Sequence, residues 1–558
     1  MSDCYFLGVD VGTGSVRAAL IRPNGEIVKT STWPIKKWNP QNDFYEQSSD
    51  DIWRSCCRVV KDVSSSVDST RIRGIGFDAT CSLVCIGEND EPLTVSPTGN
   101  LEQNVILWMD HRSKVEAEFI NLHKPNVLKY VGGKISPEMQ TPKLMWLKKH
   151  LKSTWDRAKF YFDLVDFLTW KATGDDSRSL CTLVCKWTYV AGEEKENGWD
   201  KDYFSLIGLE DLMDNCAIKI DFFNFNQQGR NVRIPGEKCG LGLKASAAKE
   251  LGLMTGTCVG AGLIDAHAGG LGLLACTAPE ISPSFDTKIG LICGTSTCLM
   301  VVSKSSKPVP GIWGPYYSAM VPDMYLNEAG QSVTGKLLNF VVETHPAFAQ
   351  LKSELSNEGE VYEYLNTLLL KIASSKGLPS PAMLTSQLHI WPDFHGNRSP
   401  LADPSLLGMV TSISGLSLTC DEKDLACRYL AAVQSLAYGT KLIVETLRSN
   451  GHDTLSTVLL CGGLSKNKLF AQVHADVLGS PVLVPKSPDP VLLGAGILGA
   501  VAAEQWHDIK EAIDNMSGPC DIFVPSQTDV KYHKKKYTVF LRMVEDQRCY
   551  QKIMECDT

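Results

Sequence analysis

The amino-acid sequence predicts an α/β protein built from two related domains. The chain has 558 residues, more than one hydrophobic core usually holds, so two domains are expected, with three as the alternative. Predicted strands alternate with predicted helices along both halves of the chain, as they do in α/β domains. A strand-turn-strand segment near the amino terminus also has a counterpart near the start of the second half.

The composition is that of a soluble globular protein, with 44% hydrophobic and 21% charged residues. A net charge of -8 gives no sign of nucleic acid or an anionic membrane as a partner. The first residues, MSDCYFLGVD, lack a basic region followed by an apolar stretch, so no secretory signal is expected. Residues 257–278 are the nearest thing to a membrane span, but they carry Asp265 and His267 near their middle and are interpreted as buried backbone.

Cysteine usage indicates a reducing compartment. The chain has 19 cysteines and no C-x-x-C pair. The closest spacings are the adjacent Cys56 and Cys57, then Cys81 with Cys85 and Cys181 with Cys185. This pattern predicts neither a zinc ribbon nor a secreted disulfide framework, so we expect reduced thiols and a cytoplasmic protein.

The first strand-turn-strand segment is FLGVDVGTGSVRAALI. Apolar runs at 6–9 and 16–21 predict two strands, and Gly12, Thr13, Gly14 and Ser15 predict the turn between them. Backbone N–H groups and hydroxyls in such a turn can hold phosphate oxygens, and Asp10 can hold a cation that bridges those oxygens. An ordinary hairpin without a ligand is the alternative.

The counterpart of this hairpin is the segment IGLICGTSTCLMVV, which aligns without gaps on LGVDVGTGSVRAAL. Gly12 matches Gly294 and Thr13 matches Thr295, whereas Asp10 matches Ile292. If the two hairpins hold one polyphosphate, only the first supplies a carboxylate on the metal side. The repeat predicts two related domains. The change from the glycine-rich GAGLIDAHAGGLGLL to the polar TAPEISPSFDTK predicts their limits, an N-terminal domain over 1–276 and a C-terminal domain over 277–558.

Other segments complete the expected alternation. IRGIGFDATCSLVCI predicts two strands around a polar interruption, and TPKLMWLKKHLKSTW predicts an amphipathic helix that opens on Pro142. In the second half, residues 421–451 predict a long helix that ends at Gly451. STVLLCGGLSKNKLFAQVHADVLG predicts a buried strand, a glycine turn and a helix, and residues 531–553 predict a solvated surface helix of mixed charge.

Two glycine patterns resemble nucleotide-binding loops without their context. GAGILG at 494–499 fits G-x-G-x-x-G, but too little chain follows for a βαβ unit, so these glycines are expected to allow close helix packing. GQSVTGKL at 330–337 has Leu337 where a P-loop needs Ser or Thr. The polar DMYLNEA before it is also not expected to form a buried strand.

The remaining motifs match the needs of a phosphotransferase that acts on an alcohol. Such an enzyme requires a phosphate cradle, a cation, a nucleoside pocket and a base for the attacking hydroxyl. The two hairpins supply the cradle, and LLCGGLSKN offers a nucleoside pocket. Asp265, in GLIDAHAG, is a lone carboxylate in an apolar context, where it is costly unless it is used. A capping Asp without chemistry is the alternative for this position.

Six motifs in this order resemble the FGGY carbohydrate kinases of the actin and Hsp70 ATPase superfamily. They are GVDVGTGSVRAAL, LWMDHR, GLIDAHAG, ICGTST, WPDFHGNRSPLADPSLLGMV and LLCGGLSKN, spread over about 460 residues. The resemblance implies two ribonuclease-H-like (actin-like ATPase) domains with a nucleotide cleft between them, and it implies ATP and Mg²⁺ as cofactors.

The resemblance also implies a role for each matching residue. Asp265 matches the general base and Asp10 the acid on the Mg²⁺ side. The residues that match the first phosphate loop are Gly12, Thr13, Gly14, Ser15 and Arg17. Those that match the second loop, a third backbone contact and the adenosine site are Gly294 and Thr295, then Gly335, then Gly462, Gly463 and Asn467.

Three further motifs look most like the ribulokinase branch of this family. They are DATCS with Ala79, CKWTY with Lys186 and NEAGQS with Glu328, which with Asp265 would line the sugar site. A surface lysine is the alternative for Lys186. The implied reaction is ATP-dependent phosphorylation of the terminal hydroxyl of a ketopentose. D-ribulose is the favoured substrate, and L-ribulose, ribitol and D-xylulose are the alternatives.

Two hypotheses from other functional classes remain open. One is an actin-like or Hsp70-like ATPase that controls a partner, although no β-rich C-terminal extension is evident. The other is a binding protein without catalysis, which the intact Asp10 and Asp265 disfavour. The expected partners are a small sugar and ATP, with no nucleic acid and no membrane, and a homo-oligomer is left open.

Overall fold

The computed structural model describes residues 4–192, 198–214, 232–355, 358–413, 419–487 and 489–555. The chain divides into two compact units. Unit 1 contains Met1–Thr277, Val302–Asn327 and Ser487–Pro519, and unit 2 contains Ala278–Val301, Glu328–Lys486 and Cys520–Thr558. The chain therefore returns to unit 1 twice after first leaving it, and the single domain limit at 276/277 stays a prediction.

Unit 1 is built on a five-stranded sheet with the order β11-β5-β1-β2-β3. Its strands are β1 (Tyr5–Val11), β2 (Ser15–Ile21), β3 (Ile27–Pro34), β5 (Ile72–Ala79) and β11 (Cys258–Ile264). β1, β2 and β3 pair antiparallel, whereas β1, β5 and β11 are parallel. The first predicted hairpin is confirmed, since β1 and β2 flank the turn at Gly12–Gly14.

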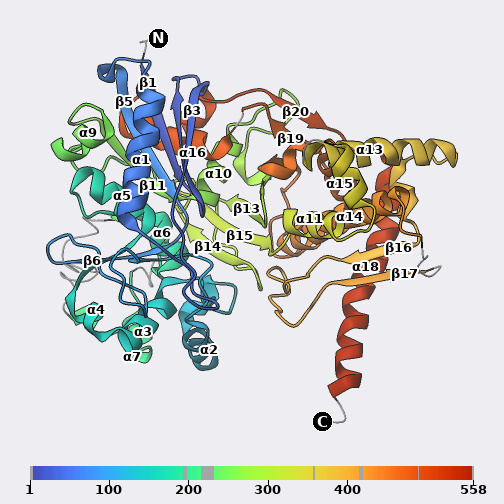
Figure 1. Ribbon diagram of the computed structural model, residues 1–558, viewed down its shortest axis with the longest axis horizontal. Coiled ribbons are helices and arrows are strands. Elements are labelled where there is room, and N and C mark those ends of the chain that lie inside the picture. The colour runs from blue at the N-terminus through green and yellow to red at the C-terminus, as the bar shows by residue number, and fades with distance from the viewer. Residues whose placement is uncertain are drawn as a thin grey trace. The chain divides into compact units, whose positions relative to one another are not determined.

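Side chains alternate between the two faces of this sheet, as strand geometry requires. Apolar side chains such as Val9 and Phe77 belong to a large hydrophobic cluster with residues of α1 (Ser49–Ser64) and α5 (Leu164–Thr173). These two helices cover one face, and α16 (Pro490–Ala502) covers the other (Figure 1). The residues that face α16 include four glycines, Gly8, Gly74, Gly76 and Gly260.

Backbone packs directly on backbone between α16 and the sheet. A Cβ on Gly8 would overlap the carbonyl oxygen of Leu492, and a Cβ on Gly76 would overlap that of Ala495. On the helix, a Cβ on Gly494 would overlap the carbonyl oxygen of Ala268 in α10 (Asp265–Leu274). The expectation that GAGILG serves close helix packing is confirmed, because its glycines lie in a buried helix against other backbone.

Unit 1 also contains a second, four-stranded sheet and a second hydrophobic cluster. The predicted helix at Pro142 is two helices, α3 and α4, because the chain leaves helical geometry at Leu151. The remaining elements of this unit are β4 (Glu46–Gln47), β6 (Leu83–Gly87), β7 (Val105–Ile106), α2 (Lys114–His123), α3 (Gln140–His150), α4 (Lys152–Arg157), β8 (Ala158–Asp163), β9 (Arg178–Ser179), α6 (Leu180–Lys186), α7 (Lys201–Leu206), α8 (Asp211–Asp214), β10 (Val232–Arg233), α9 (Ala245–Leu251), β14 (Trp313–Tyr317) and α17 (Ile509–Asn515).

Unit 2 repeats the strand order of unit 1. Its strands follow the order β15-β13-β12-β18-β19-β20, with β12 and β13 antiparallel and β12, β18 and β19 parallel. The strands are β12 (Lys288–Cys293), β13 (Thr297–Ser303), β15 (Tyr325–Gln331), β18 (Thr457–Cys461), β19 (Val482–Pro485) and β20 (Cys520–Phe523). The internal sequence repeat at the two G-T turns therefore corresponds to a repeat of strand order and strand direction.

One expectation about this sheet is wrong. The segment before GQSVTGKL was expected to lack a buried strand, yet it forms β15, which is buried along almost its whole length. The neighbours within the sheet cover the polar residues of β15, so the polarity of the segment does not predict its burial. Leu337, in the position of the metal-binding hydroxyl, still argues against a P-loop.

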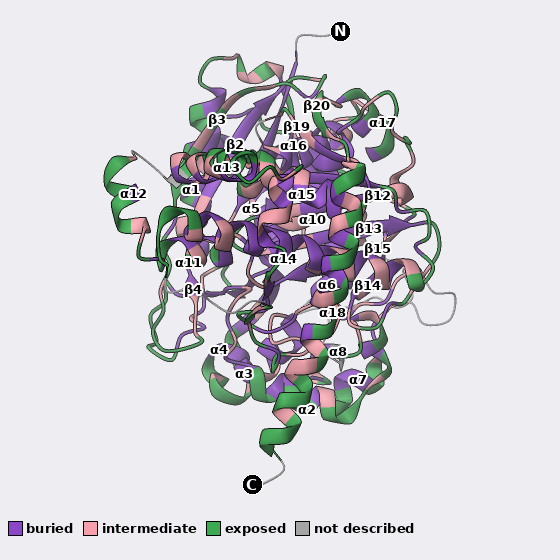
Figure 2. Cartoon of the chain, turned by 90° about the vertical axis from the view of Figure 1, so that its right-hand side faces the viewer, coloured by how far each residue is buried: buried purple, intermediate pink, exposed green. Residues whose placement is uncertain are grey.

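Helices pack around the unit 2 sheet, and the long predicted helix is confirmed as α14, which Asp421 caps. The strands and α14 are largely buried, whereas long stretches of α18 are exposed (Figure 2). The expected solvated helix near the C-terminus is only partly correct, because α18 buries His533, Lys536, Tyr537, Phe540 and Met543 along one side. The remaining elements of unit 2 are α11 (Gly335–Glu343), α12 (Phe348–Glu354), α13 (Glu358–Ser375), β16 (Leu388–Trp391), β17 (Met409–Ser412), α14 (Glu422–Ser449), α15 (Lys468–Leu478) and α18 (Gln527–Glu555).

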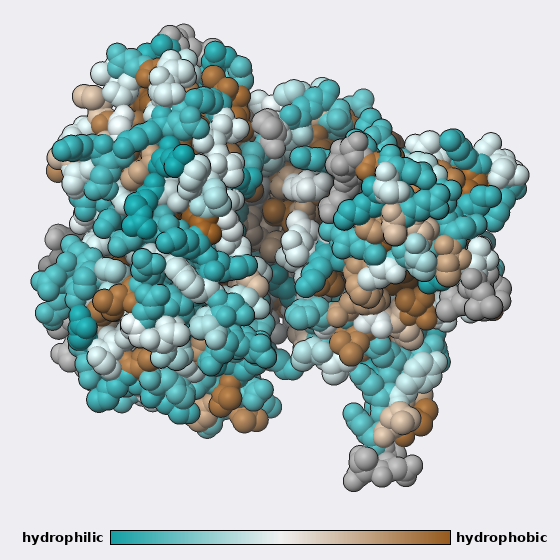
Figure 3. Space-filling model, viewed as in Figure 1, coloured by the Kyte–Doolittle hydropathy of each residue, from teal (hydrophilic) through white to brown (hydrophobic). Residues whose placement is uncertain are grey.

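Apolar side chains are scattered on the viewed surface, which is mainly hydrophilic (Figure 3). Among the described residues, no helix combines the length and the hydropathy that a bilayer span requires. The glycine-rich stretch 257–278 is instead β11 followed by α10, in agreement with its interpretation as buried backbone.

Candidate active site

Three carboxylates meet where the parallel strands of unit 1 end. Asp10 in β1 is the register partner of Asp78 in β5, and Asp265 begins α10 directly after β11. Asp10 and Asp78 occupy even positions on their strands, like Gly8 and Gly76, so they share the α16 face of the sheet. The carboxyl ends of parallel strands are the usual place for a site in α/β sheets.

The surroundings of Asp78 and Asp265 disfavour the negative charge of these two carboxylates. Burial, and then the charge of Asp10, raise the pKa of Asp78 well above its usual range. Burial and the charge of Asp10 also raise the pKa of Asp265 to about 6, although the N–H of Ala266 donates to Asp265 Oδ1 at 2.7 Å and opposes the shift. A carboxylate with a pKa near neutrality is suited to accept and release a proton.

The same carboxylates fit a hard divalent cation. Asp78 is fully buried, and no described N–H or O–H group reaches either of its oxygens. Buried carboxylates that crowd together without donors are relieved by a positive charge, and oxygen is the ligand that Mg²⁺ prefers. Asp10 and Asp78 would hold the ion, which would neutralise phosphate charge near the end of β1.

Arg17 connects the first hairpin to α16. Its Nε donates to Asp10 Oδ2 at 2.7 Å, and its Nη1 forms an ion pair with Asp489. Burial opposes the charge of Arg17, but Asp10 and Asp489 outweigh burial and raise its pKa. Asp489 also caps α16, because its Oδ1 accepts from the N–H of Val491. An acid directly before a helix-opening proline was the signal for this cap, but nothing in the sequence placed it beside Asp10.

The first predicted phosphate loop is anchored from its own unit. Gln47 Nε2 donates to the carbonyl oxygen of Thr13 at 2.9 Å, and Trp108 Nε1 donates to Thr13 Oγ1 at 3.0 Å. Gly14, at the tip, is exposed, whereas Gly12 and Ser15 are half-buried. The turn therefore has a fixed base and an accessible tip. Trp108 lies in the motif LWMDHR, but its contact with Thr13 was not predicted from the sequence. Nothing in the sequence around Gln47 indicated its contact with this loop.

Lys186 is placed with the carboxylates. It is the last residue of α6, it is 3% exposed, and its Nζ lies 4.5 Å from the centre of the Trp313 ring. Its charge lowers the pKa of Asp265, which places the ammonium group within electrostatic range of that carboxylate. The alternative of a surface lysine is therefore wrong.

Ala79 points away from the carboxylates. Its side chain belongs to the hydrophobic cluster on the α1 face, next in the strand to Asp78, which faces the other way. Only its backbone can contribute to a site at the end of β5. Cys81, two residues later, is within electrostatic range of both Lys186 and Asp265, and its role was not predicted from the sequence.

Buried polar groups continue this site beyond Cys81. Gln140 Nε2 donates to Asp163 Oδ2 at 2.8 Å and to the carbonyl oxygen of Cys81 at 3.4 Å. Burial raises the pKa of Asp163 to about 8. No described donor or acceptor pairs with Gln140 Oε1 or Asp163 Oδ1. Because buried polar atoms are normally paired, these two atoms are suited to bind hydroxyl groups.

Glu328 lies in the other unit, in β15. It is 4% exposed and accepts from Arg398 Nη2 at 3.2 Å. Arg398 belongs to the quoted motif WPDFHGNRSPLADPSLLGMV, so two of the motifs that carried the resemblance meet at this ion pair.

The second predicted phosphate loop and Gly335 are brought together in unit 2. Gly335 N donates to the carbonyl oxygen of Gly294 at 3.1 Å, and Thr334 N donates to that of Thr295 at 2.9 Å. A Cβ on Gly335 would lie 2.6 Å from the Gly294 oxygen, so only glycine allows this approach. Gly294 and Thr295 are exposed. The loop thus rests on the start of α11 and leaves its tip accessible.

The predicted adenosine residues follow the neighbouring strand, β18. Because β12 and β18 are parallel and Ile292 is the register partner of Cys461, Gly294 and Gly462 follow the same edge of the sheet. Gly462 has φ +89° and packs against Cys293, whereas Gly463 is open. Asn467 caps α15, since its Oδ1 accepts from Leu469 N at 3.1 Å.

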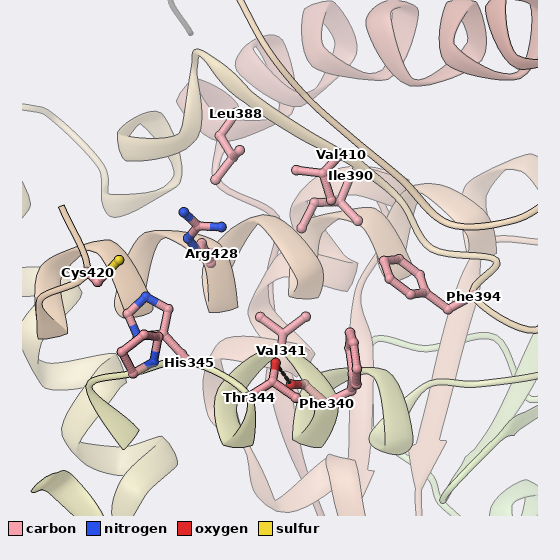
Figure 4. Close-up of a pocket in the computed structure, with 11 residues that line it drawn as sticks. Phe340, Val341, Thr344, His345, Leu388, Ile390, Phe394, Val410, Cys420 and Arg428 are labelled. Atoms are coloured by element: carbon pink, nitrogen blue, oxygen red, sulfur yellow. Dashed lines mark hydrogen bonds between the residues drawn. The ribbon is translucent and has the colours of Figure 1, made fainter. Parts of the chain in front are cut away.

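A separate apolar pocket of about 270 Å³ lies in unit 2 (Figure 4). Phe340, Phe394, Ile390, Val410 and Arg428 are among its lining residues, and its walls include none of the residues predicted from the sequence.

Comparison with known proteins identifies the family. The N-terminal domain of the FGGY family of carbohydrate kinases matches residues 5–272, and the C-terminal domain of that family matches residues 290–503. The chain belongs to the FGGY family of carbohydrate kinases.

Relatives of this FGGY kinase are similar over nearly its whole length. It is 48% identical to an FGGY carbohydrate kinase domain-containing protein of Homo sapiens over 564 residues, which cover 99% of this chain and 98% of the relative. It is 39% identical to a D-ribulokinase of Saccharomyces cerevisiae over 533 residues, or 91% of this chain and 73% of the relative. The resemblance to the ribulokinase branch is thereby confirmed, and the protein is a carbohydrate kinase that uses ATP.

The fold of the FGGY kinase matches solved structures. The xylulose kinase from Rhodospirillum rubrum superposes with a TM-score of 0.77 at 18% identity, covering 98% of this chain and 99% of that one. At this identity the likeness shows the fold, which confirms the expected two-domain actin-like ATPase architecture.

Proposed function

We propose that this FGGY kinase transfers the γ-phosphoryl group of ATP to the 5-hydroxyl of D-ribulose, with Asp265 as the general base. The observation that carries the proposal is the place of Asp265, at the end of β11, among buried carboxylates and within electrostatic range of Lys186. Support for the sugar comes from the 39% identity to the yeast D-ribulokinase.

Asp265 accepts the proton of the terminal hydroxyl as that oxygen attacks the γ-phosphorus in line. The bond from phosphorus to the bridging oxygen of ADP breaks, and ADP leaves with the negative charge. A pKa of about 6 leaves Asp265 mostly ionised at neutral pH. General-base catalysis of this kind contributes about 10²–10⁴-fold to a rate.

The first hairpin receives the phosphates. Arg17 and the backbone of the Gly12–Gly14 turn lie at its end, with Asp10 between Arg17 and Asp78. When bound, Mg²⁺ at Asp10 and Asp78 supplies positive charge that offsets phosphate charge. In unit 2 the turn at Gly294 and Thr295, supported by Gly335, forms the second phosphate contact, and Gly462, Gly463 and Asn467 receive the adenosine.

The sugar occupies unit 1 beside Asp265. Lys186 donates to a sugar oxygen, and the unpaired Gln140 Oε1 and Asp163 Oδ1 form hydrogen bonds with sugar hydroxyl groups. Ala79 contributes through its backbone, since its side chain lies in the hydrophobic cluster. Glu328 of unit 2, held by Arg398, is the further sugar residue that the ribulokinase resemblance implies.

The test is ADP release from Mg·ATP with a panel of D-ribulose, L-ribulose, D-xylulose, ribitol, L-arabinitol and glycerol. We expect kcat/KM for D-ribulose at least tenfold above every other acceptor, about 1.4 kcal/mol in transition-state preference. Preference for another acceptor would keep the kinase and replace the sugar. ATP turnover that no acceptor stimulates would favour an ATPase that controls a partner, and no turnover at all would favour a binding protein.

A further inference from the structure

A cluster of soft metal ligands lies next to the carboxylates and has no part in the proposed reaction. It consists of Cys181 and Cys185 of α6 and His267 of α10, all of them buried. The two cysteines are four residues apart on one helix, so their side chains share a face. His267 lies two residues after Asp265, in the first turn of α10.

The three side chains already have nearly the geometry of a metal site. One ligand atom from each lies within 4.8 Å of the other two, and Cys181 Sγ is 3.4 Å from His267 Nδ1. In a tetrahedral zinc site with Zn–S of about 2.3 Å and Zn–N of about 2.0–2.1 Å, a sulfur and a nitrogen ligand are about 3.6 Å apart, and two sulfurs are about 3.8 Å apart. Small side-chain movements are enough to enclose an ion.

The chemistry of the cluster favours a soft divalent cation. Cys181 Sγ lies in hydrogen-bond contact with His267 Nδ1, so a thiol and an imidazole, which are both ligands of soft cations, already face each other. A thiolate is the form that binds metal. Two thiolates, one neutral imidazole and one divalent cation form a neutral complex, which a buried site accepts far better than an uncompensated charge.

We propose that Cys181, Cys185 and His267 form a binding site for one zinc-like cation that ties α6 to α10. The site is distinct from the Mg²⁺ position at Asp10 and Asp78, because its ligands are sulfur and nitrogen rather than oxygen. Three protein ligands leave a fourth position for a water molecule or an anion. The ion joins the helix that ends at Lys186 to the helix that begins at Asp265.

The first test is the metal content of the full-length protein after expression in zinc-supplemented medium and dialysis against a chelator. Because the ligands are buried, the ion enters as the chain folds and is expected to resist the chelator. We expect about one equivalent of zinc per chain in the wild type and none in Cys181→Ser or Cys185→Ser. Cys85→Ser is the matched control, since Cys85 is a buried thiol of the same unit outside the cluster and is expected to retain the zinc.

Cobalt provides a readout of the ligands themselves. Wild type expressed with Co²⁺ is expected to show the thiolate-to-cobalt charge-transfer absorption of a tetrahedral site, and each cluster variant to lose it. Circular dichroism on the same samples separates lost binding from lost folding. Equal zinc and cobalt contents in folded wild type and folded Cys185→Ser, or a Cys181–Cys185 disulfide in the freshly isolated wild type, would overturn the proposal. None of these outcomes depends on which sugar the kinase accepts.

Discussion

Asp10 and Asp78 lie side by side as register partners on the parallel strands β1 and β5, and Arg17 contacts only Asp10 of the two by hydrogen bond. The two carboxylates therefore have different surroundings. Asp10 has a cationic partner, whereas Asp78 is buried without a described donor and has a raised pKa. A cation bound at these carboxylates would relieve this arrangement, so we expect the phosphate end of the proposed site at the end of β1.

Asp265→Asn tests the base. The substitution keeps the shape of the side chain and removes its ability to accept a proton, so we expect kcat to fall by about 10²–10⁴-fold. Nucleotide affinity, measured by calorimetry, is expected to stay within about threefold of the wild type, and wild-type kcat in the variant would rule out Asp265 as the base. Asp514→Asn, an exposed change in the same unit, is the control that leaves both quantities unchanged.

The pH dependence of kcat/KM reports the ionisation of the same group. Asp265 has a pKa of about 6 and acts in its ionised form, so activity is expected to fall as the pH drops below about 6. Lys186 lowers this pKa by its charge, so Lys186→Met is expected to move the acid limb to higher pH as well as to lower kcat/KM. The exposed Lys149→Met serves as the control, and an acid limb that stays in place in Lys186→Met would contradict the assignment.

Gly76→Ala tests the backbone packing between the sheet and α16. The added methyl group would overlap the backbone carbonyl oxygen of Ala495, so α16 would have to move away from the sheet to make room for it. Overpacking of this kind costs about 1–3 kcal/mol or more in the free energy of unfolding, which urea titration measures. Gly518→Ala is the control, because a Cβ there meets open space. Equal unfolding free energies for the two variants would refute this account of the packing.

Asp489 has two functions that substitution can separate. Asp489→Asn keeps a side chain that caps α16 but removes the charge beside Arg17, whereas Asp489→Ala removes both. We expect a loss of about 0.5–2 kcal/mol in unfolding free energy for the Ala variant, a smaller loss for the Asn variant, and weaker ATP binding in both. Asp508→Ala removes the cap of α17 and is expected to leave ATP binding intact. ATP affinity unchanged in Asp489→Ala would exclude Arg17 from phosphate binding through this contact.

Local patterns predicted the hairpins and strands of this protein well, because glycine turns and apolar runs act over short distances. The segments around Asp10 and Gly294 form the hairpins that were expected, and Gly494–Gly499 forms a packed helix rather than a nucleotide loop. The strand β15 was missed because its polar residues are satisfied by neighbours far away in the sequence, such as Arg398 for Glu328.

Contacts between distant segments explain what the sequence did not reveal about the site. Asp10 and Asp489 are separated by most of the length of the chain. Only the packing of α16 on the sheet brings both of them to Arg17. The direction of Ala79 depends on strand alternation relative to a core that the sequence alone does not locate. Asp78 was part of a quoted motif, but its lack of donors is a property of the assembled sheet.

The return of the chain to unit 1 at Ser487 has a consequence for synthesis of the protein. When the ribosome has translated the first half of the message, every strand of the first sheet has been made, but the helix that covers its glycine face has not. Unit 1 therefore cannot complete its packing until α16 has been made. A premature stop codon anywhere before Asp489 removes that helix and one of the two acidic partners of Arg17, so even a truncation late in the message is expected to abolish activity.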